Sequence, residues 1–221
     1  MTAQKTIPVL GIVGGIGSGK SAIANGLAQA RPIAVIDADL IGHQALEQQP
    51  VKQRLRDQFG TEIFDDTDSV IRSELATRVF GPTAEHSRAR EALQKIVHPV
   101  IQHSIEQQID DIRHQPDREA VLLDAAVLLE TGWQTVCDHI VFIDAPRDQR
   151  LQRVSETRNW DAAELTRREA TQLPLAEKRS RADCVLDNSG HLEDAIVGLG
   201  KIVDRMRSSS TEHPTPQKPN S

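Results

Sequence analysis

The stretch from Val9 to Ser21 constrains this chain more than any other. Its first part, Val9-Leu10-Gly11-Ile12-Val13, is apolar and rich in β-branched residues, which is typical of a buried strand. Its second part, Gly14-Gly15-Ile16-Gly17-Ser18-Gly19-Lys20-Ser21, matches the pattern G-x-x-x-x-G-K-[ST] of a phosphate-binding loop, or P-loop. Residues 22–28 then indicate a helix. The order strand, glycine-rich turn and helix predicts nucleotide binding.

The loop residues suit a triphosphate. Backbone N–H groups must wrap the phosphates, so the turn needs glycines that adopt positive φ and let the backbone come close. The start of a helix then supplies free N–H groups and a favourable dipole. We expect Lys20 to reach the β- and γ-phosphates and the hydroxyl of Ser21 to hold Mg²⁺. The expected nucleotide contacts are Gly15, Ile16, Gly17, Ser18, Gly19, Lys20 and Ser21.

Composition excludes several classes of protein. The 221 residues carry a formal net charge of −6 and no block of arginine or lysine, which argues against a dedicated nucleic-acid binder. Cys137 and Cys184 lie far apart without metal-ligand spacing, as expected in a reducing compartment. No stretch resembles a signal peptide, and no apolar run is long enough for a membrane span. We therefore expect a soluble, cytoplasmic protein without nucleic-acid or membrane partners.

Strands and helices alternate over much of the chain, which predicts an α/β fold: a three-layer parallel sheet with helices on both faces. A second short strand is expected over 33–36, and a helix over 191–207 precedes a tail, 208–221, that we expect to be disordered. Residues 1–6 are predicted to be a frayed lead-in. The remaining predicted elements are strands over 119–124, 138–144 and 182–187 and a helix over 147–157.

Residues 40–115 differ in character, being helical, polar and charged. Helices are predicted over 51–59 and 69–80, and apolar residues then recur at helical spacing from Leu93 to Ile112. Pro99 is expected to kink or divide that last helix. The segment is too long for a simple crossover, so we interpret it as a helical insertion that covers the second substrate. The nucleotide-binding core is then 1–39 with 116–207.

Acidic residues end two predicted strands. Asp37 and Asp39 follow the strand over 33–36, at the sheet edge where ligands bind in open α/β sheets. Asp124 ends the apolar strand over 119–124, as in a Walker B motif that carries an acid toward Mg²⁺. A cap on the following segment is the alternative role for Asp124.

The segment 147–181 is locally basic in an acidic chain. We interpret its central part, about 153–178, as a lid that faces phosphates. The alternative is a solvated helix pair held by ion pairs within each helix, such as Glu164 with Arg168. Its basic residues are Arg147, Arg150, Arg153, Arg158, Arg167, Arg168, Lys178, Arg179 and Arg181.

Together these residues resemble the dephospho-coenzyme A kinase family, from about Val9 to Gly200. The P-loop, Ile36-Asp37-Ala38-Asp39 and His98-Pro99-Val100-Ile101 are similar to that family's motifs. So are Arg78-Val79-Phe80, Gln172-Leu173-Pro174-Leu175, Glu177-Lys178-Arg179, Arg181-Ala182-Asp183 and Asp187-Asn188-Ser189-Gly190. The resemblance implies a P-loop kinase fold with a helical insertion and a lid.

The resemblance also implies the reaction, which is ATP-dependent phosphorylation of the ribose 3′-hydroxyl of dephospho-coenzyme A, the last step of coenzyme A synthesis. It assigns Asp39 as general base; His98 is the other candidate, and Asp37 is either a metal or water ligand or a structural cap. Mg²⁺ is expected at Ser21, with Asp124 either coordinating the ion directly or acting from outside its coordination shell. Arg153 and Arg168, with Arg158 behind them, are expected to neutralise transition-state charge, and Asn188, Ser189 and Gly190 to contact adenine through the backbone.

Two other functions remain possible at this point. Another P-loop kinase would act on a nucleoside or a shikimate-like acceptor, but the insertion and the segment from Gln172 to Gly190 argue against it. A P-loop GTPase switch would need an Asn-Lys-x-Asp motif for guanine, and the sequence contains none.

Overall fold

The computed structural model describes residues 7–115 and 117–209, which fall into two compact units. Of these residues, the sheet unit comprises 7–36, 109–115 and 117–209, and the helical unit comprises 37–108. The last helix continues to Ser209, two residues into the tail expected from position 208. The rest of that tail and the predicted lead-in over 1–6 lie outside the described residues.

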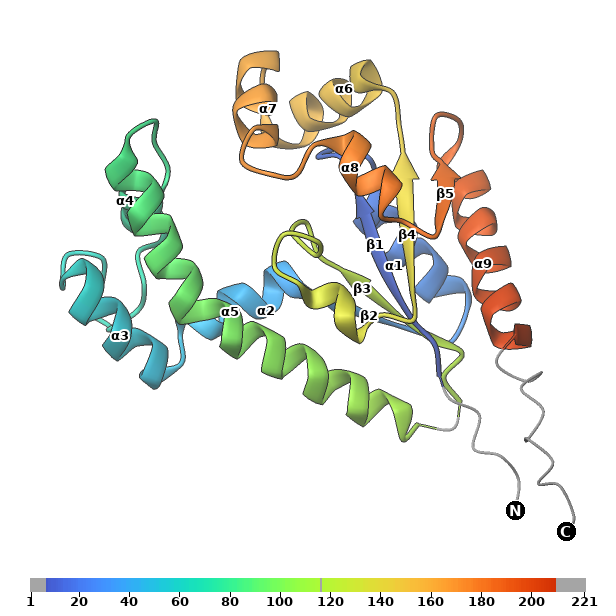
Figure 1. Cartoon of the computed structure of the whole chain (residues 1–221), viewed down its shortest axis with the longest axis horizontal. Helices are drawn as coiled ribbons and strands as arrows, with labels where there is room; N and C mark the ends of the chain where they lie inside the picture. Colours follow the sequence, from blue (N-terminus) through green and yellow to red (C-terminus); the bar gives the residue numbers. More distant parts are fainter. Residues whose placement is uncertain (1–6, 116, 210–221) are drawn as a thin grey trace, which may run out of the picture. The chain divides into compact units, whose positions relative to one another are not determined.

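Five strands form the sheet, in the order β2-β3-β1-β4-β5 (Figure 1). β1 lies parallel to β3 on one side and to β4 on the other, and β4 is parallel to β5. The predicted α/β class and parallel sheet are confirmed. The strands are β1 (Val9–Gly14), β2 (Ile33–Asp37), β3 (Ala120–Asp124), β4 (His139–Asp144) and β5 (Cys184–Asp187).

The central strand β1 is buried on both faces, as a strand in the middle of a parallel sheet should be. Leu10 and Ile12 join one core cluster with residues of two helices, α1 (Lys20–Ala30) and α9 (Leu192–Ser209). Gly11 faces the other side, where a Cβ would lie 2.6 Å from Leu128 and 2.9 Å from the sulfur of Cys137. Packed segments therefore cover both faces of the sheet.

The predicted lid region contains three helices, of which only the first, α6, was expected as an element. α6 (Arg147–Arg158) ends at Asn159, whose φ of 55° is left-handed. α7 (Ala162–Glu169) begins where the Asp161 side chain accepts the amide of Glu164, at 2.7 Å. α8 (Leu175–Ser180) follows Pro174. A 3₁₀ turn, η1 (Trp133–Val136), precedes β4 and was not expected either.

The helical unit is built from α2 (Ala38–Leu46), α3 (Gln49–Phe59), α4 (Arg72–Val79) and most of α5 (Ala84–Arg113). α4 begins three residues later than the predicted start at Ser69. The carboxylate of Asp65 accepts the amides of Thr67 and Ser69, each at 2.9 Å, which holds this stretch in a turn. Within the described residues, no helix combines the length and apolar character needed to cross a membrane.

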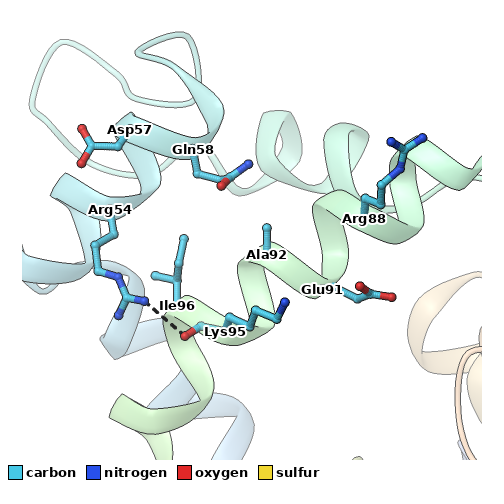
Figure 2. A pocket seen from close by; sticks show the side chains of 8 residues that line it. All are labelled: Arg54, Asp57, Gln58, Arg88, Glu91, Ala92, Lys95 and Ile96. Atoms are coloured by element: carbon cyan, nitrogen blue, oxygen red, sulfur yellow. Dashed lines mark hydrogen bonds between the residues drawn. The ribbon is translucent and has the colours of Figure 1, made fainter.

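Pro99 does not divide α5, which runs without a break from Ala84 to Arg113. Proline lacks the N–H that would bond the carbonyl four residues earlier, that of Lys95. The side chain of Arg54 on α3 donates to that carbonyl, at 3.3 Å (Figure 2). An arginine from a neighbouring helix thus supplies a hydrogen bond that the proline cannot make.

Candidate functional site

The P-loop joins β1 to α1 in the shape that an anion site needs. Gly17 and Gly19 have φ of 77° and 91°, in the left-handed region that favours glycine. Gly19 is the N-cap of α1 and offers no side chain to its first amides. The first turn of α1, described throughout, carries no acidic residue. Its N–H groups and dipole are therefore available for phosphate oxygens.

Side chains from other elements hold the carbonyl oxygens of this loop. Arg150 donates to the carbonyl of Ile16 at 3.3 Å, and Arg153 donates to those of Gly17 and Ser18 at 3.4 and 3.3 Å. The amide of Asn188 also donates to the carbonyl of Ser18, at 2.7 Å. These bonds fix three consecutive carbonyl groups of the loop.

Lys20, Ser21 and Asp124 meet at the end of the loop. The ammonium of Lys20 donates to the carbonyls of Gly14 and Gly15 at 3.5 and 3.2 Å. The hydroxyl of Ser21 donates to the carboxylate of Asp124, which is 8% exposed at the end of β3. The structure thus brings together the serine and the acid that the sequence predicts as magnesium ligands.

A hydroxyl and a carboxylate in contact are hard oxygen donors of the kind that Mg²⁺ prefers. Among the described residues, no three or more His, Cys, Asp or Glu side chains cluster as a protein cage for a metal. Mg²⁺ usually takes one or two carboxylates from a protein and completes its shell with substrate phosphates and water. The residues Ser21 and Asp124 therefore fit the ion.

Arg168 lies on an exposed face of α7. Its guanidinium donates to Glu164 at 2.8 Å and lies 4.5 Å from the centre of the Trp160 ring. Arg158 stacks on the same ring at 4.9 Å. The ion pair within α7 is the one that the solvated-helix alternative predicts, and the aromatic contact fixes where the two arginines lie. Both guanidinium groups thus gather around one tryptophan.

The segment after β5 supports the P-loop through a side chain. Asn188 is 2% exposed, its N–H donates to Asp144 at 2.7 Å, and its carbonyl accepts from Arg153 at 3.0 Å. The carbonyl of Ser189 accepts from Gln149 at 2.7 Å. Gly190 is exposed, and a Cβ there would meet nothing within 4 Å. The backbone groups of Asn188 are therefore engaged within the protein.

In the helical unit, Asp37 is the N-cap of α2 and accepts the amide of Leu40 at 2.9 Å. A structural cap is one of the two roles that the sequence leaves open for Asp37. Asp39 is exposed in the first turn of α2. Burial lowers the pKa of His98, which lies on α5.

A groove between α3 and α5 lies wholly within the helical unit and encloses about 560 Å³ (Figure 2). Three basic side chains and two acidic ones line it, with Ile96 at its floor. The polar lining residues are Arg54, Asp57, Gln58, Arg88, Glu91 and Lys95.

Sequence reasoning missed two buried cations beside the site. Arg150 is 4% exposed and Lys178 is 1% exposed. Lys178 pairs with Glu130 at 2.8 Å and donates to the carbonyl of Ala126 at 3.1 Å, in the segment after β3. Glu130 also accepts the amide of Leu173, at 2.9 Å. Both cations belong to the basic segment 147–181, and burial in the fold is what separates them from its exposed arginines.

Comparison with known proteins points to one family. The family model for dephospho-CoA kinase matches residues 8–194. A dephospho-CoA kinase from Bacillus licheniformis is 34% identical over 197 residues, which cover 89% of this chain and 95% of the relative. A crystal structure of TT1252 from Thermus thermophilus is 29% identical, covers 91% of this chain and 99% of its own, and superposes with a TM-score of 0.76. A dephospho-CoA kinase from Campylobacter jejuni, 19% identical, shares the fold with a TM-score of 0.67, over 91% of this chain and 98% of its own.

Proposed function

The chain belongs to the dephospho-CoA kinase family, and we propose that it transfers the γ-phosphoryl group of ATP to the ribose 3′-hydroxyl of dephospho-CoA. The products are coenzyme A and ADP, so the reaction is the last step of coenzyme A synthesis. One observation carries this proposal: the match extends over residues 8–194, so it includes the lid and the insertion as well as the P-loop. A likeness confined to the P-loop would support only a nucleotide-binding protein.

The sheet unit binds ATP in this proposal. The amides of residues 15–21 wrap the phosphates, which replace the loop carbonyls as partners of the Lys20 ammonium because a charged oxygen is the stronger acceptor. Lys20 then neutralises charge that develops on the γ-phosphoryl group. Ser21 and Asp124 hold Mg²⁺, which supplies electrostatic stabilisation to the phosphate oxygens when bound. Gly190 contacts adenine.

The helical unit binds the acceptor. Asp39 accepts the proton of the ribose 3′-hydroxyl as general base, because a carboxylate is the usual acceptor for an alcohol in phosphoryl transfer. His98 is the alternative base. The groove lined by Arg54, Arg88 and Lys95 suits an anionic part of the acceptor, such as its diphosphate.

The lid supplies further positive charge. We assign transition-state stabilisation to Arg168, whose guanidinium is exposed on α7. Arg153 is assigned the same role through its position on the P-loop carbonyls, from which it places positive charge beside the phosphates. The two arginines would act together when the lid closes on both substrates.

The test is release of ADP by the purified chain with ATP and a panel of acceptors: dephospho-CoA, adenosine and shikimate. We expect turnover with dephospho-CoA only. Lys20→Ala should lower that turnover by about 10² or more, because an electrostatic clamp is lost while no core residue changes. Lys201→Ala, an exposed lysine on α9, is the matched control and should retain full turnover. Turnover with adenosine or shikimate, and none with dephospho-CoA, would overturn the proposal.

A further inference from the structure

Arg150 is nearly enclosed by protein although it carries a permanent charge. It lies on α6 and is 4% exposed. Its Nε donates to the carbonyl of Ala145 at 3.2 Å, and its Nη1 donates to the carbonyl of Ile16 at 3.3 Å and forms an ion pair with Glu169. One guanidinium therefore joins the turn after β4, the P-loop and the last residue of α7.

The P-loop sequence makes room for this arginine. A Cβ at Gly15 would lie 2.7 Å from Nη1 of Arg150, closer than non-bonded atoms approach. A Cβ at Gly17 would lie 2.5 Å from the Arg150 carbonyl. Gly15 and Gly17 thus leave room for α6 as well as for the phosphates, and the P-loop packs directly against Arg150.

Glu169 neutralises the buried charge of Arg150 and joins α7 to α6. A buried guanidinium without a counter-charge is strongly unfavourable, so the pair must persist for Arg150 to stay in place. Glu169 directly follows Arg168, and successive helix residues point about 100° apart. While Glu169 is bound to Arg150 beneath the P-loop, Arg168 lies on Trp160 and Glu164. The pair therefore determines the position of the lid arginine relative to the loop.

We propose that Arg150 is a positioning residue for phosphoryl transfer: with Glu169 it forms a buried latch that holds the P-loop in its phosphate-binding shape and fixes α7 to it. This inference rests on the proposed function for its phosphoryl-transfer step. The latch acts through the Ile16 carbonyl, which it holds in place within the loop.

The central test separates positioning from simple structural support. Replacing a buried ion pair by apolar residues often leaves stability unchanged, whereas removing one partner strands a charge. We expect Arg150→Met alone to lower the melting temperature and Arg150→Met/Glu169→Leu to restore it. Both variants should bind a non-hydrolysable ATP analogue about tenfold or more weakly by calorimetry, because neither can hold the Ile16 carbonyl. KM for dephospho-CoA should stay within about twofold.

Arg150→Lys keeps the charge and a donor, so it should recover part of the ATP affinity. Arg31→Met is the matched control. Arg31 is another bridging arginine, bound to Glu119, Asp204 and the carbonyl of Gly200, before β2 and far from the P-loop in the sheet. It should lower the melting temperature without changing ATP affinity.

Wild-type affinity for the ATP analogue in the folded double variant would overturn the latch, since Arg150 would then be purely structural. The calorimetry needs no acceptor. If the wild-type chain binds ATP but ignores dephospho-CoA, the proposed function falls while the loop-holding role of Arg150 is still tested.

Discussion

At the scale of single residues, we propose that the chemistry is divided between two acids, Asp124 in the sheet unit and Asp39 in the helical unit. Asp124 ends β3 and is bound by the Ser21 hydroxyl, so it belongs to the nucleotide half of the reaction. Asp37 caps α2, and Asp39, which is exposed as Asp37 is, follows in the first turn of that helix. These contacts give each acid a different role and a different test.

Asp39→Asn should separate binding from chemistry. Asparagine keeps the size and one acceptor but cannot take a proton, so we expect kcat with dephospho-CoA to fall by at least about 10². ATP binding by calorimetry should stay near wild type because Lys20 and the loop amides are unchanged. Asp37→Asn is the control, since asparagine also caps helices well and should retain turnover.

Wild-type turnover by Asp39→Asn would exclude Asp39 as the base and make His98 the first candidate. Burial lowers the pKa of His98 below its usual value, so its imidazole is neutral at pH 7 and able to accept a proton. Loss of ATP binding would instead indicate that Asp39 serves the nucleotide.

Functional residues could be predicted from the sequence where they lie together in one contiguous motif. Gly14 to Ser21 form one contiguous pattern, so the sequence alone predicts the loop. The carbonyls of residues 16–18 accept bonds from side chains 134 to 170 positions away, and no local pattern carries that information. Arg150 differs from the exposed arginines of the same segment only in burial, which depends on the tertiary fold.

At the scale of elements, α7 carries Arg168, to which we assign transition-state stabilisation. Arg168→Ala should lower kcat at least about tenfold and change KM for ATP much less, if its contact forms mainly in the transition state. Arg167→Ala is the matched control. The Arg167 side chain is 73% exposed and is the other arginine partner of Glu164. Steady-state kinetics of both variants provide the comparison. An unchanged kcat for Arg168→Ala would place Arg168 on a merely solvated face.

Long elements were predictable, and short ones were not. Apolar periodicity predicted β1, β3, β4 and the part of α5 from Leu93 to Ile112, because each buries a continuous face, but not the first turns of α5 from Ala84. α7 has eight residues, so its single buried side chain, Leu165, gives no periodic signal. Pro99 was expected to kink or divide α5; it does not divide the helix, and a long-range bond from Arg54 engages the Lys95 carbonyl that the proline leaves. Element boundaries thus depend on contacts that local sequence does not show.

At the scale of the whole molecule, β1 is the central strand of the sheet, between β3 and β4. Alternating strands and helices predicted a parallel sheet, but the order β2-β3-β1-β4-β5 depends on crossover connections that the strand sequences do not specify. Packing over β1 has a measurable consequence at Cys137, which lies against Gly11. Burial raises the pKa of this thiol to about 12.

Cys137 should therefore report unfolding of the sheet unit. The thiolate is the reactive form, so in native Cys184→Ser protein at pH 8, iodoacetamide should modify Cys137 at least about tenfold slower than in denaturant. Unfolding restores the ordinary pKa, so the thiol of the denatured protein should be labelled fast. Cys137→Ser protein, which retains Cys184 on the edge strand β5, is the comparison. Equal labelling of native and denatured Cys137 would show that the packing over β1 opens readily.

The central claim is that this chain phosphorylates dephospho-CoA at one hydroxyl group. The most direct measurement is to incubate the purified chain with ATP, Mg²⁺ and dephospho-CoA and to identify the product by mass spectrometry and ³¹P NMR. We predict a single new phosphomonoester on the ribose 3′-oxygen, formed with one ADP per product, and at least about a hundredfold less of it with Lys20→Ala in the same time. Phosphate at another position, or unchanged dephospho-CoA beside a phosphorylated nucleoside, would contradict it.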